Sequence, residues 1–167
     1  MGARGWIAGG LAALLAPALG GCGFTPLYGT AGVSPSLSSV EVITPEGRTG
    51  HLLSEDLQDD LAVHHGETAK YRLALSLNEL RYARGLSSEN VATWYELSLQ
   101  VSYSLIDKET GQTLVAGVEP ISVSYNAVND PYAGIVAQQD GQKRAAAEAA
   151  QRIRINLARY FAKQAHP

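Results

Sequence analysis

Hydrophobic and polar positions alternate along much of the second half of the chain, which predicts long strands. Residues 91–105 place Tyr, Leu and Val on one side and Glu, Ser and Gln on the other. Residues 71–78 alternate in the same way, and a polar loop over residues 82–90 separates the two runs. A turn over residues 107–111 and a returning strand over residues 112–126 follow.

The returning strand changes its pattern part of the way along. Its apolar side moves from Leu114, Ala116 and Val118 to Ile121 and later odd-numbered positions. One extra residue in a strand has this effect. The sequence therefore predicts a β-bulge near residues 117–120.

Two segments have the spacing of helices. Leu53, Leu57 and Leu61 recur every four residues with acidic residues between them, and Gly66 is a suitable end for this helix. Asp130 followed by Pro131 has the residue types of a helix start, and alanine and large apolar residues share one face from there to about Gln164.

The first element of the domain is predicted to be a strand over Leu37–Thr44, ended by residues 45–47. The predicted order is β-α-β-β-β-α. We expect an α/β chain of the α+β two-layer kind, in which a four-stranded, mainly antiparallel sheet carries two helices on one face.

The chain begins with the features of a signal peptide. Arg4 precedes the uncharged apolar stretch from Trp6 to Leu19, which is shorter than the about 20 residues that cross a bilayer. The sequence predicts a removed signal over residues 1–21, a flexible tether over residues 22–36 and one domain over residues 37–167.

The only cysteine, Cys22, stands directly after this apolar stretch. Leu19-Gly20-Gly21-Cys22 resembles the lipobox of bacterial lipoproteins, in which the thiol receives a diacylglycerol and the new amine is acylated. Two or more acyl chains anchor a protein stably without a membrane-spanning segment. The alternative is a free or disulfide-linked thiol, although a single cysteine has no partner within its own chain.

Composition excludes several classes of function. The formal net charge of −3 and the predicted export both argue against nucleic-acid binding. The sequence has no nucleophile elbow, phosphate-binding glycine loop or dinucleotide motif, so we expect neither an enzyme nor a cofactor. The best metal candidate is His64-His65 beside Asp59 and Asp60, of which Asp60 and His64, four residues apart, would share a helix face. The sequence favours a simpler interpretation for His64-His65, which is an interaction with the helix dipole without metal.

Basic residues gather near the second predicted strand of an otherwise acidic chain. Arginine binds phosphate through paired hydrogen bonds and lysine binds it as a point charge. The candidates for a phosphorylated ligand are Lys70, Arg72, Arg81 and Arg84. An ordinary solvated strand face would have the same composition. A second basic group on the last helix is interpreted as its polar face, and it contains Lys143, Arg144, Arg152, Arg154 and Arg159.

Several of these features together resemble the LptE family of lipopolysaccharide-assembly lipoproteins. The sharpest match is Cys-Gly-Phe-Thr-Pro-Leu-Tyr-Gly over residues 22–29. The element order agrees, as do the alternating strand that ends at Asp107, the Thr110-Gly111 turn and the Asp130-Pro131 pair before the last helix.

The resemblance implies a non-enzymatic lipoprotein on the periplasmic side of the outer membrane. Such proteins plug the LptD β-barrel, help it to assemble and bind lipopolysaccharide, and Gly23 is consistent with outer-membrane sorting. The long strand would then present small polar side chains to the barrel lumen, namely Ser98, Gln100, Ser102 and Ser104. Arg81 and Arg84 are the leading candidates for contact with lipid A phosphates. A lipid-anchored binding domain for another envelope partner, or an anchored metal enzyme, are the alternatives.

Overall fold

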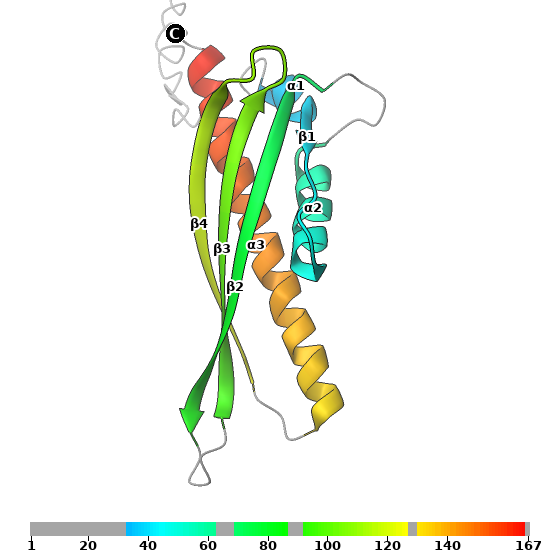
Figure 1. Cartoon of the computed structure of the whole chain (residues 1–167), viewed down its shortest axis with the longest axis vertical. Helices are drawn as coiled ribbons and strands as arrows, with labels where there is room; N and C mark the ends of the chain where they lie inside the picture. The colour runs from blue at the N-terminus through cyan, green and yellow to red at the C-terminus, as the bar shows by residue number, and fades with distance from the viewer. Residues whose placement is uncertain (1–32, 63–68, 87–91, 127–129, 166–167) are drawn as a thin grey trace, which may run out of the picture.

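The computed structural model of the protein describes residues 33–62, 69–86, 92–126 and 130–165. Figure 1 shows α2 and α3 on the same face of one long sheet, whose strand order is β1-β2-β3-β4. β1 is parallel to β2, and the other pairs are antiparallel. The predicted α+β two-layer fold is confirmed. The elements are α1 (Val33–Ser38), β1 (Val40–Val42), α2 (Arg48–Asp60), β2 (Tyr71–Leu86), β3 (Ala92–Asp107), β4 (Thr113–Asn126) and α3 (Pro131–Ala165).

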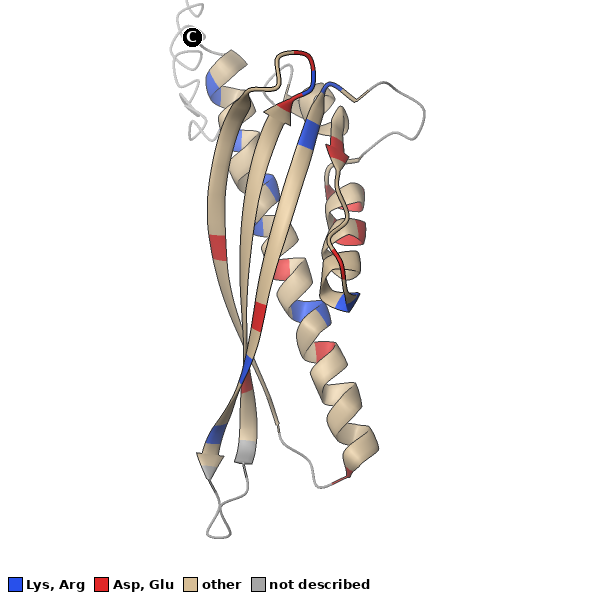
Figure 2. Cartoon of the chain, in the orientation of Figure 1, with Lys and Arg blue, Asp and Glu red and all other residues tan. Residues whose placement is uncertain are grey.

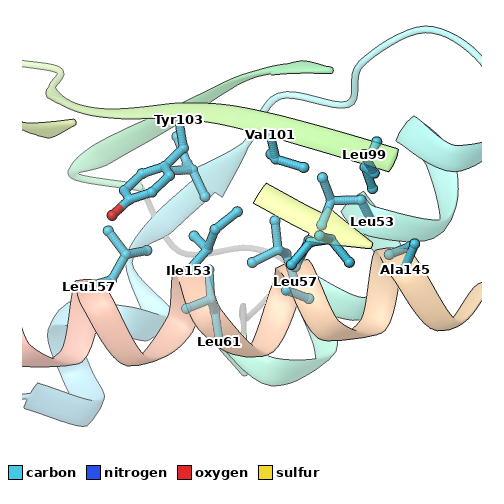
Figure 3. Packing of buried hydrophobic residues seen from close by; sticks show 14 of the residues in the cluster. Leu53, Leu57, Leu61, Leu99, Val101, Tyr103, Ala145, Ile153 and Leu157 are labelled. Atoms are coloured by element: carbon cyan, nitrogen blue, oxygen red, sulfur yellow. The ribbon is translucent and has the colours of Figure 1, made fainter. Parts of the chain in front are cut away.

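The core lies between the sheet and the two longer helices, as Figure 3 shows. Leu99, Val101 and Tyr103 of β3 face the helices. Leu53 and Leu57 of α2 are fully buried against them, as predicted from their spacing. The buried face of α3 is largely alanine, and small side chains let helices and sheet approach closely. Its buried residues include Ala145, Ala146, Ala149, Ala150, Ile153 and Leu157.

The strand β2 is longer than the sequence predicted. Residues 82–86 were expected in a polar loop, but they continue the ladder with β3. Tyr82 pairs with Glu96, and Arg84 pairs with Trp94. The backbone hydrogen bonds to β3 hold this segment although Tyr82, Ala83 and Arg84 are exposed. The polar residues after residue 81 therefore predicted too early an end for β2.

The bulge in β4 lies away from its predicted position. The register shifts between Leu105 and Ile106, whose partners are Val115 and Thr113, so the extra residue is Leu114. Beyond it the ladder is regular through residues 117–120, and the prediction of a bulge there was wrong. Gly117 and Glu119 face the helices at positions that the sequence assigned to the outer side.

Two contacts explain this inward orientation. The ring of Tyr103 occupies the space above Gly117, where a Cβ atom would lie 2.6 Å from the tyrosine hydroxyl. Asn156 Nδ2 donates a hydrogen bond to Glu119 Oε1 over 2.6 Å. Gly117 and the hydrogen-bonded Glu119 thus occupy two inward positions, where large hydrophobic residues are usual. The sequence pattern therefore did not indicate that they point inward.

The start of the domain also differs from the sequence prediction. The predicted strand over Leu37–Thr44 is reduced to Val40–Val42, and Leu37 is buried in the short helix α1. This helix also includes residues 33–36, which the sequence assigned to the tether. Pro35 fits the first turn of a helix, and Ser38 Oγ donates to its carbonyl oxygen over 3.1 Å. Within the described ranges, no helix has the length and apolar character needed to cross a membrane.

Candidate functional site

One face of the sheet carries no helix from the described part of the chain (Figure 1). The side chains that point to it alternate with buried residues of β3 such as Leu99 and Val101. The structure places four candidates on this helix-free face, and they are Ser98, Gln100, Ser102 and Ser104. The four therefore share one face, as their alternation predicted.

Small side chains continue across the middle of the helix-free face. Ser102 pairs with Ser76 of β2 and Val118 of β4, and the neighbouring row joins Ala74, Ser104 and Ala116. Together they line a shallow depression of about 540 Å³. Few Lys, Arg, Asp or Glu residues lie along the middle of the strands (Figure 2). Another protein surface can approach this sheet closely without displacing long side chains.

The four basic candidates do not form one patch. Lys70 and Arg72 lie at the start of β2, whereas Arg81 and Arg84 lie near its other end. A strand rises about 3.3 Å per residue, so Arg72 and Arg84 are roughly 40 Å apart. Arg84 belongs to the helix-free face, but Arg81 pairs with the buried Leu97 and faces the helices. The four basic residues are close in the sequence, but the extended strand places the two pairs at opposite ends of the sheet.

Arg84 is held by contacts on the helix-free face. Its Nε atom lies 2.9 Å from Glu96 Oε2, and its guanidinium lies 5.3 Å from the centre of the Tyr82 ring. Ser122 Oγ donates to the other oxygen of Glu96. The hydrogen bond from Ser122 and then that from Arg84 hold the pKa of Glu96 below its usual range. An anionic ligand would compete with Glu96 for Arg84.

Arg81 connects the sheet to the first part of α3. Its Nη1 atom donates to Gln138 Oε1 over 2.9 Å, and its guanidinium lies 4.9 Å from the centre of the Tyr95 ring. Tyr95 stacks on Tyr125, with 5.6 Å between the ring centres. The cation is therefore positioned by an aromatic pair and remains exposed.

A second depression lies at this end of the sheet, between β4 and α3, and measures about 580 Å³. Trp94, Asn126 and Arg144 are among its lining residues. Arg144 pairs with Asp140 over 2.8 Å and donates to the carbonyl oxygen of Ser124 over 3.2 Å. Sequence reasoning missed this group because it treated Arg144 as part of a solvated helix face. Trp94, a large aromatic residue near the start of a predicted strand, could have indicated this depression.

The first turns of α3 add exposed apolar side chains at the same end of the molecule. Asp130 Oδ1 accepts hydrogen bonds from the amides of Tyr132 and Ala133, which confirms the predicted helix cap. Tyr132 is 77% exposed, and Ile135 and Val136 are about half exposed. The hairpin end, which we define as the end of the sheet with Arg81, Arg84 and Trp94, thus combines cations with apolar and aromatic surface.

The described residues contain no group of three or more His, Cys, Asp or Glu that could hold a metal ion. α2 ends at Asp60, and Ala62 adopts a positive φ of 51°, outside the range of an α-helix. Asp60 lies 3.5 Å from Arg154 of α3. His64, His65 and Cys22 lie outside the described residues.

Known structures resemble this chain over most of the domain. A proposed lipoprotein from Caulobacter crescentus CB15 is 48% identical, with a TM-score of 0.70, and the match covers 80% of this chain and 98% of that one. Lipoprotein B from Nitrosomonas europaea (17%, TM-score 0.54, 76% and 84% covered) and rare lipoprotein B from Shewanella oneidensis (19%, TM-score 0.50, 76% and 97% covered) share the fold. Among curated protein sequences, none matches.

The fold and these relatives indicate the class of bacterial lipoproteins in which helices cover one face of a long sheet. A family model described as LptE, lipopolysaccharide-assembly, matches residues 36–162. The chain belongs to the LptE family, and the family resemblance of the sequence is confirmed.

Proposed function

We propose that this lipoprotein is anchored to the outer membrane through acylated Cys22 and acts as the plug of an LptD-type β-barrel. In this role it assists assembly of the barrel and binds lipopolysaccharide on its way to the cell surface. The protein is a translocon component and no enzyme. The supporting observation is its membership of the LptE family, matched over residues 36–162.

The helix-free face fits the lumen of a large barrel. Such a lumen is polar, and Ser98, Gln100, Ser102 and Ser104 present hydroxyl and amide groups without net charge. The small residues on the neighbouring strands keep the middle of this face shallow. We therefore assign the helix-free face to contact with the barrel wall.

The test is gentle detergent extraction of the tagged full-length protein from its native membrane. A large β-barrel protein that stays bound in a one-to-one complex through size exclusion is the expected result. If the protein elutes alone, the alternative of a lipid-anchored binding domain with another envelope partner replaces the plug function. A metal analysis of the same sample tests the remaining alternative, an anchored metal enzyme, for which we expect no bound metal.

We place lipopolysaccharide at the hairpin end, where Arg81 and Arg84 offer cations for the phosphates of lipid A. Tyr82 and Trp94 supply exposed apolar surface next to Arg84, and the exposed Tyr132 adds apolar surface on the first turn of α3. Lys70 and Arg72 have no ion-pair partner among the described residues, but no large exposed aromatic group accompanies them there. The combination of charge with apolar area favours Arg81 and Arg84.

A matched pair of charge reversals separates the two ends of β2. Arg81→Glu with Arg84→Glu should weaken lipopolysaccharide binding about tenfold or more, because hydrogen bonds to charged groups contribute about 1.5–3 kcal/mol each. Lys70→Glu with Arg72→Glu changes the net charge equally and should have a small effect. Binding is measured by titration with lipopolysaccharide, and unfolding temperatures show whether each variant is folded. Equal weakening by both pairs would contradict this placement.

A further inference from the structure

The end of the sheet opposite the hairpin end has a depression of about 420 Å³ that is lined by both polar and apolar side chains. Its apolar lining comes from β2, β4 and the last turns of α3, and consists of Tyr71, Leu114, Tyr160 and Phe161. The ring centre of Phe161 lies 5.2 Å from that of Tyr71 and 5.4 Å from that of Tyr160. An aromatic cluster therefore forms one part of the depression, and Ser36, Asp107 and Gln164 form its polar part.

Burial within this cluster is uneven. Phe161 is only 5% exposed, but Tyr71, Tyr160 and Leu114 are only partly buried where they line the depression. Leu114 is the extra residue of the β4 bulge. An additional aromatic or aliphatic side chain would remove more of this surface from water, which is the main driving force for apolar association.

The chain that precedes α1 is close enough to supply such a side chain. Ser36 of α1 lines the depression, and Val33, the first described residue, lies one helical turn earlier, about 4.5 Å along the axis. Residues 29–32 are Gly-Thr-Ala-Gly, and before them stands the apolar segment Phe24–Tyr28. Tyr28 is five residues from Val33, and five extended residues span at most about 18 Å, so the link tethers Tyr28 within that distance of α1.

We propose that the segment Phe24–Tyr28 docks into this depression and packs its apolar side chains on Tyr71, Leu114 and Tyr160. The short link through residues 29–32 gives the segment a high effective concentration at the site, which favours docking within one chain. The polar lining residues Ser36, Asp107 and Gln164 offer hydrogen-bonding groups for the backbone of an extended segment. Pro26 restricts the conformations of the free segment and lowers the entropy that docking removes.

Docking would have a mechanical consequence for the lipid anchor. Cys22 precedes Phe24 by two residues, or about 7 Å of extended chain. The acyl chains would then be held beside α1 and the end of α3, and the hairpin end would point away from the membrane surface. This inference does not depend on the identity of the barrel partner or on lipopolysaccharide binding.

Disulfide trapping tests the contact in the chain of residues 22–167 carrying Cys22→Ser. Thr25→Cys and Gln164→Cys introduce the only two thiols, and mild oxidation is followed by gel mobility and mass spectrometry. We expect cross-linking at least tenfold faster than in the same pair with Phe24→Ser and Leu27→Ser added. Thr25→Cys with Gln139→Cys is the control. Gln139 is 25 residues from Gln164 on α3, or about 37 Å along the helix, and a segment docked at Gln164 does not extend that far.

Each other outcome overturns the proposal. Equal rates with and without the two serine substitutions would mean that the segment visits Gln164 without docking. Absence of cross-linking in both would mean that the depression has another occupant, such as a partner protein. Mixed chains that each carry one of the two cysteines should stay monomeric. A covalent dimer formed at the same rate would show that a second copy supplies the segment.

Discussion

Gly117 lies where β4 passes beneath the ring of Tyr103. A Cβ atom at this position would be 2.6 Å from the Tyr103 hydroxyl and 2.8 Å from two ring atoms. Tyr103 is only 6% exposed and packs against Leu157 of α3, as Figure 3 shows, so its ring has little room to move. Gly117→Ala should therefore lower the free energy of unfolding by about 1–3 kcal/mol, the usual cost of overpacking a core.

The same substitution elsewhere in the chain provides the control. Gly134 lies in the first turns of α3, where an added Cβ would meet nothing within 4 Å. Alanine is favoured over glycine inside a helix, so Gly134→Ala should stabilise the protein by about 0.5–1 kcal/mol. Urea unfolding measures both variants. A loss of stability in Gly117→Ala no larger than about 0.5 kcal/mol would contradict the packing argument.

Asp107 organises the turn between β3 and β4 through its carboxylate. Its Oδ1 atom accepts hydrogen bonds from the amides of Thr110 and Glu109 and from Thr110 Oγ1. The Thr110 amide contributes most to a pKa of Asp107 below its ordinary value. Because the folded pKa is the lower one, the carboxylate stabilises the turn above the unfolded pKa of about 3.9, and this is lost as the pH falls through the folded value.

The corresponding prediction concerns Asp107→Asn, which keeps an acceptor but removes the charge. The variant should be less stable than the parent chain at pH 7, and the difference should shrink steadily below about pH 4. The pKa of Asp107 is measured by titrating its carboxyl ¹³C resonance in the folded chain and in urea, which tests whether folding lowers it. Identical midpoints in the two states would contradict it.

At the scale of elements, β4 is an edge strand partly covered by arginines from α3. Arg152 Nη1 donates to the carbonyl oxygen of Pro120 over 3.0 Å, and Arg144 Nη2 donates to that of Ser124 over 3.2 Å. These carbonyls must therefore point away from β3. Pro120 also has no amide hydrogen to offer a further strand. Uncovered edges pair readily with other chains, and these contacts occupy part of the edge of β4.

Arg144→Ala with Arg152→Ala should therefore cause self-association that increases with protein concentration. The removed side chains leave two edge carbonyls open for pairing with another copy. Sedimentation velocity over a range of concentrations is the measurement. Arg159→Ala with Lys163→Ala, which removes the same charge from exposed positions of α3, is the control and should remain monomeric. Equal association of both variants would mean that net charge, and not the edge, controls it.

The elements differed in how well the sequence predicted them. β3 was predicted because its alternation continues through the whole core, and the start of α3 because Asp130 caps it. The end of β2 and the position of the β4 bulge were wrong, since both depend on pairing with β3 rather than on local composition. The basic candidates could not be arranged without the sheet. Arg81 and Arg84 lie on opposite faces because β2 continues through both of them, whereas the sequence placed Arg84 in a loop.

The whole molecule has two different ends. Near α1 lies the aromatic depression around Phe161, and the described chain begins there. At the hairpin end lie Arg81, Arg84 and Trp94, with the exposed first turns of α3 (Figure 1). β2 alone has 16 residues, or roughly 53 Å. A lipid anchor at the first end would thus leave the proposed lipopolysaccharide site far from the anchored membrane surface.

The length of the sheet also gives the helix-free face enough area to contact a barrel wall along most of the molecule. Ser102→Arg places a long cation in the middle of the shallow depression on that face. Ser102 is exposed, so the free energy of unfolding should change by no more than about 0.5 kcal/mol. The variant should nevertheless lose the barrel protein during detergent co-purification, because the added side chain holds the two surfaces apart.

Gln151→Arg provides the matched control for this last prediction. Gln151 is exposed on α3 beside Arg152, where one more arginine extends a surface that already carries this side chain. We expect this variant to retain the barrel. Retention by both variants would remove the helix-free face from the interface and leave the plug hypothesis without a contact surface. Loss only in Ser102→Arg would assign the barrel wall to the strands and leave the arginine side of α3 free of it.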